Sequence, residues 1–239
     1  MLKLRMGFAL LASLAFAGVS QAAIGTVDMS WDGCTGPVDK TTNVAGVHSI
    51  FITVTGHDVP QDGYDVRVVY GNASNLVPDA WRFDADGCEG SSLIVQDINS
   101  KACPPFHQNS LHSLQIKRVE FSPPYDPYPT TLMRVLLANV YDPVTSVNPG
   151  TRYLLERIGF DLTAAVPGAS TPPTSCGGFE QPMCFKLSYA SFIDPDNQEY
   201  LFNRSREPLT VSFNGPSACF GAVPAQPKTW GSIKSQYRN

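Results

Sequence analysis

Residues 64–70, with the sequence Tyr-Asp-Val-Arg-Val-Val-Tyr, decide the fold class of this chain. Their large apolar side chains stand at every second position: Tyr64, Val66, Val68 and Tyr70. Such alternation is typical of a strand with one face in the core and the other in solvent. The same pattern recurs on one face of four other runs: Val27 to Trp31, Ile50 to Val54, Met183 to Tyr189 (through Phe185 and Leu187) and Leu209 to Phe213. We therefore predict an all-β protein with antiparallel strands.

Proline and glycine separate these runs. The chain of 239 residues contains 20 Pro and 19 Gly, and its prolines gather at 104–105, 123–129, 143–149 and 167–173. Because proline interrupts helices and central strands alike, helical bundles and coiled coils are excluded. Short strands joined by turn residues favour one antiparallel β-sandwich with long proline-rich loops. Two small β domains divided near Cys103 are the alternative.

Three segments are less regular. Residues 132–141 are apolar on both faces, which predicts a central strand covered on both sides. Residues 114–121 change phase after Lys117 and Arg118, which predicts a β-bulge at that point. Residues 153–162 fit a strand or a helix, and the Pro-Gly pairs on either side favour a strand.

The N-terminus has the three parts of a secretory signal peptide. Lys3 and Arg5 form a positive region, an apolar run covers 6–19, and Ser20 and Ala22 supply small side chains at the two positions that signal peptidase reads. The run is shorter than the ~20 residues that a helix needs to span a bilayer. We predict that residues 1–22 are removed and that the mature protein is secreted or held at the cell surface, without a membrane span.

The charge balance excludes two classes of partner. Removal of the signal peptide takes away Lys3 and Arg5, so 15 of the 17 basic residues remain against 21 acidic ones, a net charge of −6. The remaining Lys and Arg are scattered along the sequence. Nucleic acids and anionic membrane surfaces bind through clustered Lys and Arg, so neither is expected as a partner.

All six cysteines follow the signal peptide: Cys34, Cys88, Cys103, Cys176, Cys184 and Cys219. An even number in an exported chain predicts disulfides, and six cysteines allow 15 pairings. Proximity in sequence favours Cys88–Cys103 and Cys176–Cys184, which leaves Cys34–Cys219 to join the two ends. No C-x-x-C pair is present, so zinc binding and redox catalysis are disfavoured.

The chain lacks the common catalytic motifs. Neither G-x-S-x-G nor H-E-x-x-H occurs. Glycoside hydrolysis needs two carboxylates across the scissile bond, and the sequence does not select a pair among 21 acidic residues. We expect a non-catalytic binding or structural module for an unknown extracellular protein or glycan. The alternative is a secreted hydrolase acting on carbohydrate through an unidentified Asp/Glu pair, and the oligomeric state stays open.

Two acidic turns are candidate calcium sites, and we expect no other cofactor. Each gathers oxygen ligands within six residues: Asp84, Asp86 and Glu89 in the first, and Asp194, Asp196 and Glu199 in the second. Neither completes the twelve-residue EF-hand pattern. The alternative is an ordinary turn in which Asp or Asn side chains bond to their own backbone.

The proline-rich loop 123–129 is a candidate ligand-binding element. It carries Tyr125 and Tyr128 on a backbone that proline stiffens, so two aromatic faces are presented to a sugar or peptide at little entropic cost. The alternative is that both tyrosines fold over the end of the sandwich.

Two resemblances to known proteins concern the C-terminal third. Residues 153–162, the stretch FKLSYASF at 185–192 and LTVSF at 209–213 resemble the last strands of cohesin-like and related immunoglobulin-like β-sandwiches. That resemblance implies the sandwich fold. Residues 229–238 read TWGSIKSQYR, and through this tail the chain as a whole is similar to uncharacterised secreted bacterial proteins that end in the same motif. This second resemblance implies no activity.

The C-terminal tail forms the last predicted unit. Three apolar residues share one face of a helix capped by Thr229: Trp230, Ile233 and Tyr237. We predict a sandwich domain over 23–223, then a linker and a short amphipathic helix over 224–239. The helix either packs on the sandwich or serves as a recognition tail for export, anchoring or a partner groove.

Overall fold

A computed structural model describes nine segments of the chain. They are residues 25–56, 61–90, 93–96, 103–106, 111–124, 128–145, 148–165, 176–201 and 209–215. The predicted signal peptide, Tyr125, and the predicted C-terminal linker and helix lie outside these segments. Within them, no helix is long and apolar enough to cross a bilayer.

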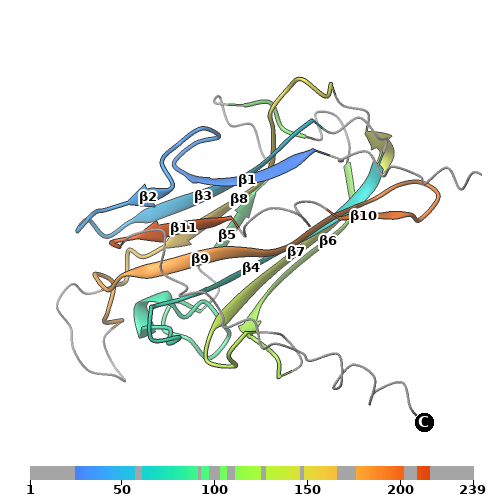
Figure 1. The fold of residues 1–239 in the computed structure, drawn as a ribbon. Coiled ribbons are helices and arrows are strands. Elements are labelled where there is room, and N and C mark those ends of the chain that lie inside the picture. The colour runs from blue at the N-terminus through green and yellow to red at the C-terminus, as the bar shows by residue number, and fades with distance from the viewer. Residues whose placement is uncertain are drawn as a thin grey trace, which may run out of the picture.

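The described residues form strands and one short 3-10 turn, which confirms the predicted all-β class (Figure 1). The strands are β1 Thr26–Trp31, β2 Asp39–Lys40, β3 Val47–Thr55, β4 Gln61–Gly71, β5 Leu93–Gln96, β6 Leu111–Phe121, β7 Met133–Thr145, β8 Tyr153–Asp161, β9 Met183–Ile193, β10 Glu199–Leu201 and β11 Thr210–Phe213. The 3-10 turn, η1, covers Asp79–Trp81.

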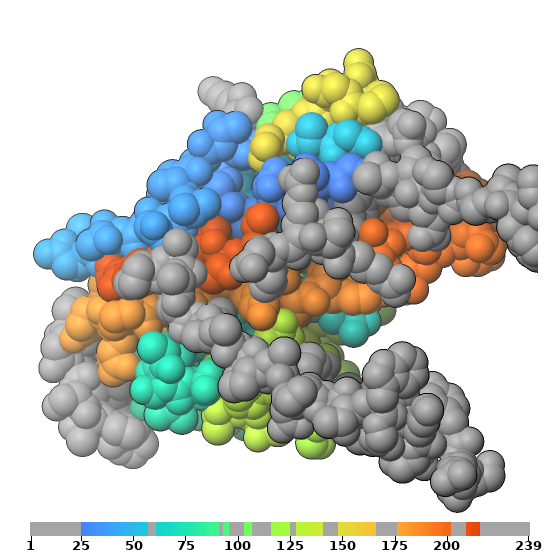
Figure 2. All heavy atoms as spheres, in the orientation of Figure 1, coloured from blue at the N-terminus to red at the C-terminus, as the bar shows by residue number. Residues whose placement is uncertain are grey.

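The strands assemble into two sheets. The four-stranded sheet has the order β1-β3-β8-β5, and the seven-stranded sheet has the order β2-β11-β9-β4-β7-β6, with β10 paired to β9. Among the named strands only β2 and β11 pair in parallel. In the space-filling view the blue atoms of the N-terminal strands lie against the red atoms of β11 (Figure 2).

Aromatic side chains fill the space between the sheets. The Trp31 ring of the four-stranded sheet lies 5.4 Å from Phe185 and 5.7 Å from Phe213 of the seven-stranded sheet, centroid to centroid. Phe160 on β8 also meets Phe185, at 5.1 Å. The Trp31 indole donates a 2.7 Å hydrogen bond to the carbonyl of Ser212, so its polar atom is satisfied inside the core. The two sheets therefore form the predicted β-sandwich.

The predictions for residues 153–162 and 132–141 agree with the structure to different extents. Residues 153–162 form strand β8, as predicted. Strand β7 lies between β4 and β6, but its outer face is covered only near its start: Arg134 is buried whereas Val140 is 39% exposed. The prediction of a strand covered on both sides is therefore correct only for the first residues of β7.

The predicted bulge after Lys117 and Arg118 is wrong. The register of β6 against β7 is uninterrupted from Leu114 to Phe121, and the irregularity lies between His112 and Leu114. The change of phase misled because Ile116 is not a core residue: it points to the opposite side of β6 from Val119 and is 43% exposed.

The disulfide pairing also differs from the prediction. Cys34 pairs with Cys103, and Cys88 pairs with Cys176. Cys184 is disulfide-bonded as well. Cys88–Cys103, Cys176–Cys184 and Cys34–Cys219 are therefore all wrong. Sequence proximity fails as a guide here because a sandwich brings segments 69 and 88 residues apart into contact.

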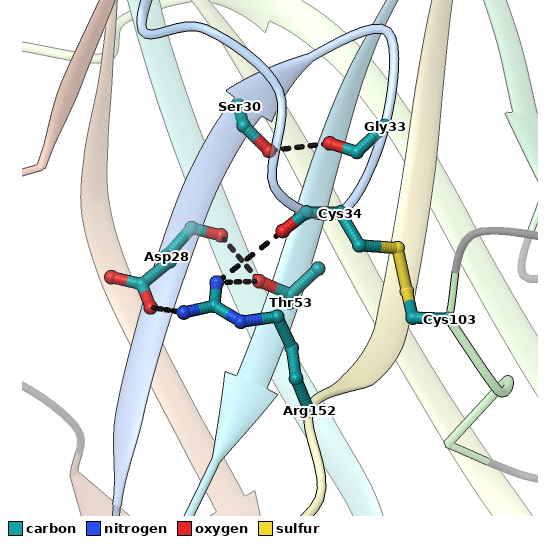
Figure 3. Close-up of a disulfide and its surroundings, with 7 residues drawn as sticks. All are labelled: Asp28, Ser30, Gly33, Cys34, Thr53, Cys103 and Arg152. Atoms are coloured by element: carbon teal, nitrogen blue, oxygen red, sulfur yellow. Dashed lines mark hydrogen bonds and ion pairs between the residues drawn. A yellow bond between two sulfur atoms is a disulfide. The ribbon is translucent and has the colours of Figure 1, made fainter.

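The Cys34–Cys103 bridge lies on the outer face of the four-stranded sheet (Figure 3). The two cysteines cover Phe51 and Leu154, forming a small apolar cluster separate from the main core. Arg152 fastens the loop that carries Cys34. Its guanidinium lies 3.0 Å from the Asp28 carboxylate and donates hydrogen bonds to the Thr53 hydroxyl (3.0 Å) and to the Cys34 carbonyl (3.4 Å).

Candidate functional site

The first acidic turn separates its three carboxylates. Asp84 accepts two hydrogen bonds from the Arg82 guanidinium, at 3.1 and 2.7 Å, whereas Asp86 is exposed. Glu89 is buried, and its Oε1 has no hydrogen-bond partner within the described part of the chain. Burial, with a smaller contribution from the charge of Asp161, raises the pKa of Glu89 to about 7.

In the second acidic turn, the carboxylate of Asp194 accepts hydrogen bonds from residues of the same turn. Asp194 accepts backbone hydrogen bonds from Gln198 (2.8 Å) and Asp196 (2.9 Å), and a 2.8 Å bond from the Tyr200 hydroxyl. These bonds, that from Gln198 first, lower the pKa of Asp194. Glu199 instead accepts from the Tyr189 hydroxyl. Among the described residues, no three His, Cys, Asp or Glu side chains are grouped to hold a metal ion. Calcium binding stays a prediction.

Tyr128, the described tyrosine of the proline-rich loop, lies beside the seven-stranded sheet. The Lys186 ammonium is 5.1 Å from the centroid of its ring. Lys186 is half-buried on β9, and burial lowers its pKa. The pair of tyrosines as a sugar-stacking site remains a prediction, because Tyr125 falls outside the described segments.

Strand register places a row of four side chains across the outer face of the seven-stranded sheet. Tyr189 on β9 pairs with Arg67 on β4, Arg67 with Leu136 on β7, and Leu136 with Arg118 on β6. Register partners point to the same face of a sheet. The adjacent row is built in the same way from Ser191, Asp65, Ala138 and Ile116.

Arg67 is held at the centre of this face. Its guanidinium donates to both oxygens of Asp65, at 3.3 and 2.6 Å, and lies 4.4 Å from the centroid of the Tyr189 ring. The hydrogen bond to Asp65 raises the pKa of Arg67, so the group is cationic throughout the physiological range. The Tyr189 hydroxyl donates to Glu199 on β10. Three strands thus fix one cation and one aromatic ring.

Aliphatic groups lie next to this charged centre. Ile116 is 43% exposed and Val140 39% exposed, while Leu136 and Ala138 are half-buried. The Arg118 side chain is 68% exposed. Tyrosine and arginine are enriched at the centre of protein-binding interfaces, and the aliphatic side chains beside them add apolar area that a partner can cover. We call these two rows, with Val140, the outer face.

A β-bulge places Tyr189 on the outer face. The register of β4 against β9 shifts between Arg67, which pairs with Tyr189, and Val68, which pairs with Leu187, so Ser188 is the extra residue. Its hydroxyl donates a 3.0 Å bond to the Arg67 carbonyl. The alternation of Met183, Phe185 and Leu187 had predicted Tyr189 on the core face, and that part of the prediction is wrong. No signal in the sequence marks the bulge.

The fold and this surface define a disulfide-bonded β-sandwich protein with a mixed charged, aromatic and aliphatic outer face. The chain matches no known family model and no curated protein. Solved structures similar to it are cohesin modules.

A non-cellulosomal cohesin from the hyperthermophilic archaeon Archaeoglobus fulgidus is 11% identical, with a TM-score of 0.39, over 79% of this chain and 91% of that one. A cohesin module from a family 33 glycoside hydrolase of Clostridium perfringens is 8% identical, with a TM-score of 0.37, over 81% and 98% of the two chains. The second type II cohesin module of the adaptor scaffoldin ScaA from Acetivibrio cellulolyticus is 9% identical, with a TM-score of 0.36, over 81% and 98%.

Proposed function

We propose that this protein is a secreted, non-catalytic module that binds an extracellular protein through the outer face of the seven-stranded sheet. The observation that carries the proposal is the fixed position of Arg67, bonded to Asp65 and stacked on Tyr189 beside exposed aliphatic groups. A cation and a ring already held in place lose little conformational entropy when a partner binds. The disulfides support secretion, because such bonds persist in oxidising compartments.

A protein fits this face better than a glycan does. Sugars stack on the open face of an aromatic ring, whereas one face of the Tyr189 ring is occupied by the Arg67 guanidinium. The exposed Ile116 and Val140 side chains offer apolar area that a protein surface would cover. The sheet also presents its residues over four strands, an extent that matches a protein partner.

Binding measurements with matched variants test the proposal. The protein is immobilised and exposed to a panel of purified extracellular proteins and to a glycan array. Arg67→Ala and Tyr189→Ala each weaken binding of a protein hit by about tenfold or more. The control is Arg157→Ala, which removes a second guanidinium lying near an aromatic ring, here 6.0 Å from Phe51 on the other sheet. Equal affinity for all variants, or binding only to glycans, would overturn the proposal.

One observation favours a secreted carbohydrate hydrolase as the second candidate function. Glu89, with its pKa of about 7, is about half protonated at neutral pH, and the charge of Asp161 contributes to that raised pKa. Glycosidases use an acid of raised pKa together with a second carboxyl group. A screen against aryl glycosides and polysaccharides tests this candidate. Turnover that is abolished by Glu89→Gln and Asp161→Asn would favour it over the binding module.

A further inference from the structure

Strand β6 forms one edge of the seven-stranded sheet. It pairs with β7 on one side, and no strand of the described segments pairs with it on the other. At 11 residues, Leu111–Phe121, it is long for an edge strand. A long edge presents a row of backbone N–H and C=O groups to which another strand can pair.

The hydrogen-bond pattern shows which backbone groups of β6 face outward. The Ser122 N–H donates a 2.8 Å bond to the Leu132 carbonyl, in the same register as the rest of the β6–β7 ladder. Bonded and non-bonded pairs alternate in an antiparallel ladder. Glu120 and Arg118 therefore bond to β7, whereas the N–H and C=O groups of Phe121, Val119 and Lys117 point away from it.

We propose that β6 pairs antiparallel with β6 of a second copy of this chain, about a two-fold axis at Val119. In this register Val119 faces Val119 of the second copy. Lys117 of each copy faces Phe121 of the other. All of these residues have outward-facing backbone groups, so the pairing forms about six backbone hydrogen bonds. The two seven-stranded sheets become one continuous sheet across the axis.

Charge complementarity selects this register. The two-fold axis at Val119 places Arg118 of each copy directly opposite Glu120 of the other, which makes two pairs. Opposite charges on facing strands attract. The Arg118 side chain is 68% exposed and already lies 2.6 Å from its own Glu120, so the guanidinium is near the position required. An axis at Arg118 or at Lys117 instead places two like charges opposite each other.

The side chains at the edge also explain why the pairing is specific rather than general. Charged edge residues commonly protect a sheet against unwanted pairing. Here Arg118 and Glu120 complement their own sequence read in the opposite direction, whereas Lys117, which faces Phe121, donates a hydrogen bond to the Leu93 carbonyl of β5. Because an edge contact buries less surface than a typical stable interface, we infer a reversible, concentration-dependent dimer.

Sedimentation velocity over a wide concentration range tests the dimer. Wild-type protein shifts from monomer to dimer as concentration rises, whereas Arg118→Glu, which places Glu opposite Glu, lowers the association constant by about tenfold or more. Val119→Pro removes an outward N–H without breaking a bond to β7, and proline is tolerated on edge strands. The control Val44→Glu changes an exposed apolar residue in the loop between β2 and β3, and β2 lies at the opposite edge of the sheet, so this variant leaves the dimer unchanged. A monomer at every concentration, or a dimer that both β6 variants retain, would overturn the proposal.

Cross-linking tests the register without relying on affinity. In the Val119→Cys variant the Cα atoms of the two cysteines are about 5.5 Å apart. A short bis-maleimide reagent therefore links the two thiols and yields a covalent dimer. Ile116→Cys is the matched control on the same strand, because its two copies lie six residues apart along the ladder, roughly 20 Å. Equal cross-linking of both variants, or none for Val119→Cys, would exclude this register.

Discussion

Asn139 on β7 donates a 2.5 Å hydrogen bond to the carboxylate of Glu156 on β8, so a polar contact joins the two sheets inside the core. The Tyr64 hydroxyl donates to the same carboxylate oxygen. All three side chains are 1% exposed or less. A buried carboxylate is tolerated only where donors solvate it, which is the role of Tyr64 and Asn139 here.

Removal of this carboxylate should destabilise the fold. Glu156→Ala leaves the Tyr64 and Asn139 donors without their acceptor and opens a cavity, so we expect the free energy of unfolding to fall by about 2–4 kcal/mol. Urea denaturation followed by circular dichroism measures this loss. The control Asp196→Ala, an exposed acid, should change stability by about 0.5 kcal/mol or less. A loss no larger than that of the control would contradict the structural role of Glu156.

The disulfide pairing can be checked directly. Digestion under non-reducing conditions, followed by mass spectrometry, should yield linked peptides joining Cys34 to Cys103 and Cys88 to Cys176. A peptide joining Cys88 to Cys103 would contradict the structure. The double variant Cys88→Ala with Cys176→Ala should lose about 4 kcal/mol of stability, because the bridge closes a loop across 88 residues.

The sequence predicted the fold well because alternation of apolar residues is a local signal. Strands β3 and β4 follow it, and their inward residues, among them Ile52 and Val68, are fully buried. The contact between the Arg67 guanidinium and the Tyr189 ring on the outer face was not predicted. Tyr189 has the phase of a core residue, and only the extra residue Ser188 turns it outward. A bulge is set by pairing with another strand, so its position depends on a partner that is distant in sequence.

Long-range pairing also explains the other errors. Which cysteines meet depends on how the two sheets stack, not on their separation in sequence: Cys34 and Cys103 are 69 residues apart, and Cys88 and Cys176 are 88 apart. Glu89 looked like one acid of a hydrophilic turn, yet it is buried. Its burial follows from the position of its loop in the folded protein, beside Asp161. The alternation and spacing of residues in the sequence do not show that position. Disulfide pairing and the burial of Glu89 depend on contacts between segments distant in sequence, so they could not be predicted from local patterns.

Gly178 should tolerate no side chain. Its φ is +87°, in the left-handed region that L-residues rarely adopt, and an added Cβ would lie 2.6 Å from the Pro78 Cβ. We expect Gly178→Ala to cost about 1–3 kcal/mol through backbone strain and this clash. Thermal denaturation measures the change. Gly33→Ala is the control, because nothing lies within 4 Å of an added Cβ there. Equal melting temperatures for the two variants would refute the strain at Gly178.

The raised pKa of Glu89 predicts how stability depends on pH. The carboxyl has an ordinary pKa of 4.5 in the unfolded chain and about 7 in the fold, where burial disfavours its charged form. Between these values the native state binds more protons, so the contribution of Glu89 to stability is fully present below about pH 4.5 and is lost as pH rises through 7. The loss is at most about 3 kcal/mol.

Glu89→Gln removes this dependence because the amide stays neutral at every pH. Relative to wild type, the variant should therefore gain about 1–3 kcal/mol between pH 4 and pH 8. Urea denaturation at a series of pH values measures the difference. Asp86→Asn, an exposed acid in the same turn, serves as the control and should give a curve parallel to wild type. A Glu89→Gln curve that is also parallel would show that burial does not raise the pKa of this carboxyl. The hydrolase alternative, which needs Glu89 protonated at neutral pH, would then lose its support.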